Sequence, residues 1–137
     1  MSAAGERGQV TAFLAVFVVA LLAVAGLVID GGYTLAAKRR AMNEAEGAAR
    51  AAAQAVTPGS LRQGNPVLDS SKATLAAENY LTKTGHTGTI AIDGQRVSVT
   101  VSFAQPMLVL GLGGLGHVTV TGHGQARPVR GLTEEER

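Results

Sequence analysis

Cysteine and tryptophan are absent from this chain of 137 residues, and it has only three phenylalanines and two tyrosines. Without cysteine there can be no disulfide, no cysteine nucleophile and no cysteine-ligated zinc. The net charge is only +2, and no basic patch is interleaved with aromatic side chains, which excludes the usual kind of nucleic-acid-binding surface. The hydrophobic share of 46% must therefore come mainly from aliphatic side chains and alanine.

One long apolar run lies near the N-terminus. Residues 10–29, VTAFLAVFVVALLAVAGLVI, contain no formally charged side chain. As a helix that rises ~1.5 Å per residue, they would span about 30 Å, the thickness of the hydrocarbon core of a bilayer. We therefore predict a transmembrane helix over residues 9–30, with membrane lipid as its surroundings.

A secretory signal peptide is the alternative interpretation of this run. The tripeptide AVA ending at Ala25 offers a small-x-small cleavage site, and cleavage there would release a secreted stand-alone binding module. Two features favour a retained helix. The apolar residues continue to Ile29, and Glu6 beside Arg7 leaves the preceding segment without a clear positive charge.

An alanine-rich helix is predicted over residues 31–56, because alanine has the highest helix propensity and a Glu46–Arg50 pair has i,i+4 spacing. Alanines recur every three or four residues and so share one helix face. We call this face the alanine stripe, and it comprises Ala41, Ala45, Ala48 and Ala52. Such a smooth face permits close backbone approach. It packs either on the chain's own sheet, which we favour, or on neighbouring subunits.

A small domain of mixed structure is predicted over residues 57–126. A polar loop follows the alanine-rich helix, and Ser70 or Ser71 is expected to cap a short helix. The side chains expected on the buried side of that helix are Leu75, Ala76, Tyr80 and Leu81.

Alternation with a period of two then predicts strands. Asp93-Gly94 separates the runs TIAI and RVSVTVSF, which predicts a hairpin with a type I′ turn. A third strand is predicted in HVTVTGHGQA. The side chains expected to face the core are Val97, Val99, Val101, Phe103, Val118 and Val120. The expected fold class is α+β: a transmembrane helix continuing into an alanine-rich helix, then a short helix and a small antiparallel sheet of about three strands.

The connection QPMLVLGLGGLG between the second and third strands is too apolar for an ordinary surface loop. We expect residues 107–115 to cover the open end of the sheet. The alternative is an exposed patch that meets a partner or the membrane. Residues 127–137 are polar and are predicted to be disordered.

No motif indicates catalysis. Residues 111–116 match G-x-G-x-x-G, but a strand follows where a dinucleotide-binding loop needs a helix. His117 and His123 share a strand face about 20 Å apart at ~3.3 Å per residue, so they cannot bind one metal together. His86 lies in a Gly/Thr-rich loop, where we expect it to be solvated. We predict a protein that is not an enzyme, with no catalytic residue, no cofactor and no metal.

The stretch GERGQVTAFLAVFVVALLAVAGLVIDGGYTLAAKRRAMNEAEGAARAAAQA resembles the start of the TadE/TadG-like proteins of Flp (tight-adherence) pilus systems, especially the short forms of high-GC Gram-positive bacteria. The resemblance is carried by Arg7-Gly8 before the apolar run, by Asp30-Gly31-Gly32 at its end and by the alanine-rich residues 41–55. The last predicted strand, which ends in QARP, is also similar. This resemblance implies a pilin-like layout and a structural role in a type IV-related pilus or secretion apparatus at the cell surface.

The same resemblance implies processing by a prepilin-type peptidase, which cuts after a glycine and leaves the apolar helix in place. Gly8 and Gln9 flank the matching bond, so residues 1–8 would form a short cytoplasmic leader. Prepilins usually carry Glu as the fifth residue after the cut, whereas this chain has Phe13. The implied partners are the peptidase and other pilus or secretion-system subunits.

The resemblance further implies a single-pass protein of the cell membrane with residues 57–126 on the extracytoplasmic side. The basic residues Lys38, Arg39 and Arg40 follow the apolar run, and by the positive-inside rule they favour the opposite orientation. Folded C-terminal domains can be exported regardless of such charges, so we adopt the orientation that the resemblance implies.

Overall fold

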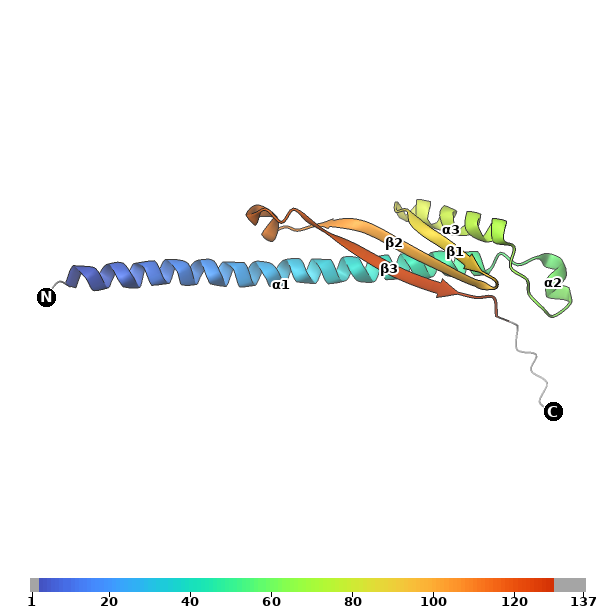
Figure 1. The fold of residues 1–137 in the computed structure, drawn as a ribbon, viewed down its shortest axis with the longest axis horizontal. Helices are drawn as coiled ribbons and strands as arrows, with labels where there is room; N and C mark the ends of the chain where they lie inside the picture. The colour runs from blue at the N-terminus through green and yellow to red at the C-terminus, as the bar shows by residue number, and fades with distance from the viewer. Residues whose placement is uncertain (1–2, 130–137) are drawn as a thin grey trace, which may run out of the picture. The chain divides into compact units, whose positions relative to one another are not determined.

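The computed structural model describes residues 3–129, which form α1, α2, α3, β1, β2, the 3-10 helix η1 and β3 in that order (Figure 1). The chain divides into two compact units. The first unit joins the part of α1 up to Ala36 with residues 105–118, and the second holds residues 37–104 and the chain from Thr119 onward. Residues 1–2 of the predicted leader and 130–137 of the predicted disordered tail lie outside the described residues.

Helix α1 extends over Ala3–Ala53, which makes 51 residues. Glu46 and Arg50 form the ion pair that their spacing predicts, with 3.3 Å between Arg50 Nη1 and Glu46 Oε2. The helix ends three residues before the predicted end at residue 56. The reason is a tertiary one, because Val56 forms an isolated antiparallel bridge with Leu68 instead of another helical turn.

Two shorter helices belong to the second unit. Helix α2 (Pro58–Arg62) replaces part of the predicted polar loop, and it starts with a proline, whose missing N–H costs nothing at the first helical position. Helix α3 (Ser70–Thr84) is capped by Asp69 and not by either of the serines that follow it. The Asp69 carboxylate accepts a hydrogen bond from the backbone N–H of Lys72, and this bond lowers the pKa of Asp69.

The buried face of α3 differs from the prediction. Leu81 is buried as expected, but Leu75 is 58% exposed and Tyr80 36%. The other two buried positions are Ala73 and Ala77. The spacing of four residues is that of one helix face, and the two alanines on it let α3 approach its neighbours closely. Periodicity alone favoured the larger side chains because it carries no information about the space available.

The three strands form one antiparallel sheet in the order β1 (Gly88–Asp93), β2 (Arg96–Pro106), β3 (His117–Ala126). Asp93 pairs with Arg96, so the hairpin loop consists of Gly94 and Gln95. Gly94 has φ 57°, and within residues 3–129 only glycines have a positive φ. Positive φ at the first loop residue alone is the pattern of a type II′ turn, so the predicted type I′ turn is wrong.

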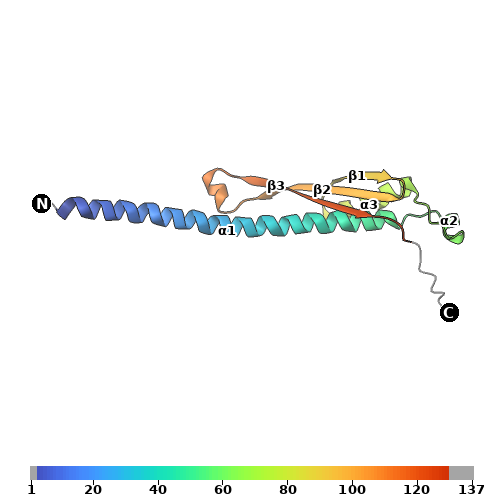
Figure 2. The ribbon, with the colours of Figure 1, turned by 60° about the horizontal axis from the view of Figure 1, so that its bottom comes forward.

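The core of the second unit lies between one face of the sheet and two helices. Val97, Val99 and Val101 of β2 are at most 1% exposed, and they pack against small residues of α1 and α3. Phe103 is partly buried against the same cluster. Figures 1 and 2 show α3 and the second part of α1 beside the strands. The α+β fold class and the three-stranded antiparallel sheet predicted from the sequence are confirmed.

The first unit contains the apolar part of α1 and the connection between β2 and β3, which includes η1 (Leu110–Gly113). None of residues 107–115 belongs to the core cluster of the sheet, so the expectation that they cover it is not met. They contact α1 instead. The cause is an interaction between backbone amides and a carboxylate, which the apolar character of the segment does not predict.

Candidate functional site

The first candidate surface is the apolar part of α1. Residues 8–25 and 27–29 are all exposed, with Phe13 at 72%, Leu22 at 64% and Val28 at 69%. A helix that is apolar on all sides is typical of a membrane-spanning segment. Among the described residues, one helix is long and apolar enough to cross a membrane; a signal sequence near the N-terminus would meet the same criterion.

The predicted processing bond lies within this helix. Gly8 and Gln9 are both exposed, and a side chain at Gly8 would meet no atom within 4 Å. No packing therefore obstructs the bond between them in the described structure.

Asp30, at the end of the apolar run, is the most heavily hydrogen-bonded side chain of the first unit. Its carboxylate accepts hydrogen bonds from three consecutive backbone N–H groups: Leu108 at 2.9 Å, Val109 at 3.0 and 3.2 Å, and Leu110 at 2.7 Å. Asp30 is only 2% exposed. We call this arrangement the Asp30 clamp. Sequence reasoning used Asp30 only as an end marker of the apolar run, because the partners lie 78 to 80 residues away.

A close steric contact lies one helical turn before the clamp. Gly26 is buried, and a Cβ at this position would collide with the side chain of Val109. The clamp and this contact fix the connection to α1, while three leucines of the connection point outward. Their exposures are 59% for Leu108, 91% for Leu112 and 60% for Leu115.

The alanine stripe is fully buried in the second unit, with each of its four members 0% exposed. Two glycines of β3 lie directly on it: a Cβ on Gly122 would collide with the backbone of Ala41, and one on Gly124 with the backbone of Ala45. The stripe therefore packs against the chain's own strand. Sequence reasoning missed the role of the two glycines, although their i,i+2 spacing in TGHG places them on one strand face.

His86 contacts a buried acid and is only partly exposed, whereas the sequence suggested a solvated side chain. Its Nδ1 lies 2.8 Å from Glu44 Oε2, and its ring stacks on Phe103 with 4.2 Å between centroids. Glu44 is 7% exposed and also accepts a hydrogen bond from Arg40 Nε at 3.0 Å. The reason for the error is that Glu44 lies 42 residues from His86, on a different element.

This contact gives a testable expectation. Replacing His86 with alanine should lower the free energy of unfolding by about 1–3 kcal/mol, because a hydrogen bond to a buried carboxylate and a ring contact are lost. The exposed His117 supplies the matched control, and His117→Ala should change stability little. Urea unfolding of the full chain in detergent measures both. Equal stability of the two variants would show that the Glu44 contact contributes nothing.

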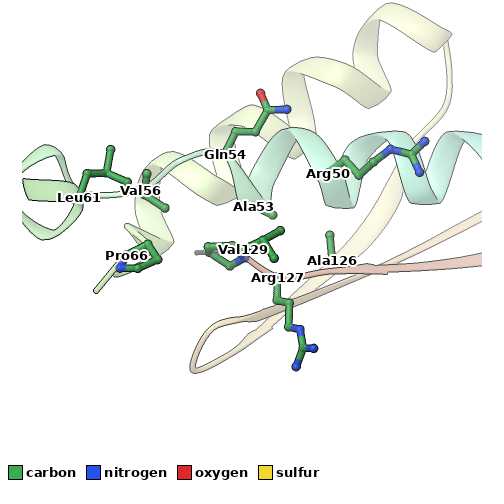
Figure 3. A pocket seen from close by; sticks show the side chains of 10 residues that line it. Arg50, Ala53, Gln54, Val56, Leu61, Pro66, Ala126, Arg127 and Val129 are labelled. Atoms are coloured by element: carbon green, nitrogen blue, oxygen red, sulfur yellow. The ribbon is translucent and has the colours of Figure 1, made fainter. Parts of the chain in front are cut away.

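The second unit also contains a cavity of about 400 Å³ beside the end of α1, α2 and the end of β3 (Figure 3). Its lining is largely apolar, and Arg50 and Arg127 are the charged residues among those named in it. Among the described residues, no carboxylate or histidine lines it. Across residues 8–129, whose side chains the structure describes, no group of three or more His, Asp or Glu side chains could hold a metal ion.

Comparison with known protein families gives a match to part of the chain. Residues 8–55 match the model of the family Tad, described as "Putative Flp pilus-assembly TadE/G-like". The matched range is about a third of the chain and contains the apolar part of α1, Asp30 and the alanine stripe. Searches of the curated proteins and of the solved structures gave no match.

Proposed function

We propose that this chain is a membrane-anchored component of a Flp (Tad) pilus or a related secretion apparatus, acting as a pilin-like subunit or as an assembly factor. The observation that carries the proposal is the coincidence of the family match with α1. Residues 8–55 comprise an apolar helix that is exposed from residue 8 to residue 29 except at Gly26, followed by a stripe buried under the chain's own sheet. One half of the helix is thus available for lipid or for other helices, and the other half holds a folded domain.

In this proposal, residues 9–30 cross the membrane once, residues 1–8 form a cytoplasmic leader, and residues 57–126 form an extracytoplasmic domain. The role is structural and not enzymatic, and it requires no cofactor. The partners are lipid and other subunits of the apparatus.

The surface of the proposed span is compatible with movement from lipid into contact with the helices of other subunits. Lipid tails and apolar helices are equally hydrophobic, so a helix can leave one for the other without losing hydrophobic burial. Small residues permit close helix packing, and the span has alanine at positions 12, 15, 20, 23 and 25. We further propose that a prepilin-type peptidase cuts between Gly8 and Gln9, which would remove the leader and keep the span.

A gene-deletion strain tests the function. Surface pili should be lost and should return when the full chain is supplied. In the complemented strain the protein should be found in the membrane fraction, and mass spectrometry should find its N-terminus at Met1 or Gln9. Normal pili without the gene would contradict the role. A product beginning at Gly26 in the medium would instead support the secreted binding module.

A matched pair of variants tests the processing step in the same strain. Gly8→Leu should leave the N-terminus at Met1, because the proposed peptidase cuts after a glycine. Gly5→Leu, three residues earlier, should leave processing unchanged. Cleavage that persists after Gly8 is replaced would exclude the proposed bond.

A further inference from the structure

The connection between β2 and β3 has the properties of a second lipid contact. Residues 103–116, FAQPMLVLGLGGLG, contain no charged side chain, and the three outward leucines defined above are more than half exposed. We propose that residues 107–116 lie in the membrane interface beside the last apolar turn of α1, with Leu108, Leu112 and Leu115 inserted into lipid. This inference rests on the proposed function, because it requires residues 9–30 to span the membrane.

The attachment points determine the depth of this segment along α1. The segment contacts α1 at Gly26 and at Asp30, which are separated by about 6 Å of helix at ~1.5 Å per residue. Those contacts lie on the last turn of the apolar run. Apolar groups at membrane interfaces typically insert about 5–10 Å, so this part of the helix lies at the depth where such insertion occurs.

Backbone hydrogen bonding makes this depth physically acceptable. In lipid, every unpaired backbone N–H is costly, so irregular chain is tolerated only where its amides have partners. The N–H groups of residues 108–110 bind the Asp30 carboxylate. Those of residues 107, 112, 114 and 115 bind carbonyls within the same segment, with the Met107 amide on the Gly116 carbonyl at 3.2 Å.

Asp30 gains from the same arrangement. A carboxylate at the edge of the hydrocarbon region is expensive unless it is paired. Three amides donate to this one and leave it 2% exposed, so their N–H dipoles replace the water that would otherwise stabilise its charge. The clamp therefore buries Asp30, the only acid at the end of the span. It also holds the segment with Leu108, Leu112 and Leu115 exposed.

Continuity with the span favours lipid over a protein partner. On α1 beside the clamp, Leu27 is 61% exposed and Val28 69%. The exposed leucines of the segment add apolar surface at this level of the span, and residues 103–116 supply no charged groups of the kind that usually rim a protein interface.

The absence of cysteine permits a direct test, because one introduced cysteine is the only labelling site in the chain. The full chain is reconstituted into phosphatidylcholine–phosphatidylglycerol vesicles after labelling with an environment-sensitive fluorophore at Leu112→Cys. Val28→Cys marks the span, and the exposed Lys83→Cys in α3 is the control for the folded domain. Lipids brominated along the acyl chain then serve as quenchers.

We expect roughly a two-fold loss of fluorescence at positions 28 and 112, and little loss at position 83. Quenching at 28 without quenching at 112 would overturn the inference and leave the proposed function standing. No quenching at 28 would overturn the membrane span itself and the inference with it. Protection of the label at 112 that depends on protein concentration, without lipid quenching, would identify a second copy as the occupant and overturn the lipid contact.

Two variants separate the clamp from simple hydrophobicity. Asp30→Asn removes the carboxylate that holds the amides, and Gly26→Leu pushes Val109 away without changing charge. Both should reduce quenching at position 112 and preserve it at position 28, which also shows that the span remains in place. Ala25→Leu, at an exposed position, should reduce neither. Unchanged quenching at 112 in both variants would show that the clamp does not position the segment.

Discussion

Replacing Gly122 and Gly124 together with alanine should destabilise the second unit more than any other small change. Each added Cβ would meet the backbone of α1 and not a flexible side chain, so strand and helix would have to separate. Overpacking costs about 1–3 kcal/mol per site. Replacing glycine with alanine stabilises a protein by only about 0.4–1 kcal/mol, because it lowers the conformational entropy of the unfolded chain. The steric cost therefore exceeds this gain. It is also large compared with the free energy of unfolding of a whole domain, which is typically about 5–15 kcal/mol.

Two glycines with open surroundings provide matched controls. A Cβ at Gly59 or at Gly116 meets nothing within 4 Å, so the same substitution there should leave stability unchanged or slightly raised. Urea unfolding and protease resistance of the full chain in detergent would compare the four positions. If Gly122→Ala is as stable as Gly59→Ala, β3 does not approach the backbone of α1 as closely as described.

Larger side chains on α1, in the alanine stripe that β3 covers, should destabilise the second unit in a similar way. Ala45 and Ala48 are 0% exposed, so Ala45→Leu or Ala48→Leu should each cost about 1–3 kcal/mol. Asn43 lies two residues away on the exposed face of α1. Asn43→Leu introduces the same side chain there and should cost little, so the comparison holds general hydrophobicity constant.

Two measurements distinguish the possible roles of the alanine stripe. Loss of protease resistance in the Ala45 and Ala48 variants would show that the stripe stabilises the chain's own domain. Loss of co-purifying membrane partners with unchanged protease resistance would place it at a contact between subunits, against our expectation. Equal behaviour of all three leucine variants would show that the packing of the stripe has no special role.

Patterns confined to one element were sufficient for the architecture. The uncharged run of residues 10–29 predicted a long apolar helix, and the i,i+4 spacing of Glu46 and Arg50 predicted their ion pair. Alternating valines predicted the buried face of β2. These patterns are reliable because the helical period of 3.6 and the strand period of 2 are backbone properties that each segment carries by itself.

Some local predictions failed because two neighbouring solutions were nearly equivalent. Asp69 caps α3 immediately before Ser70 and Ser71, the two residues predicted as alternative caps, and all three residue positions carry good capping side chains. The hairpin loop is shifted by one residue from the predicted position, so that Gly94 occupies its first place. In each case the sequence restricted the cap or the turn to neighbouring positions, and the tertiary structure determined which position is used.

The candidate sites depended on contacts between distant segments. Asp30 finds its amide partners 78 to 80 residues along the chain, and Glu44 meets His86 across 42 residues. Gly122 and Gly124 acquire a role only when β3 lies against α1. The sequence by itself determined the membrane-type helix and the α+β class, because periodicity and propensity act within a segment. Only the tertiary structure decided which polar groups are paired and which small residues are pressed together, because hydrogen bonding and steric fit depend on where the chain brings separate segments into contact.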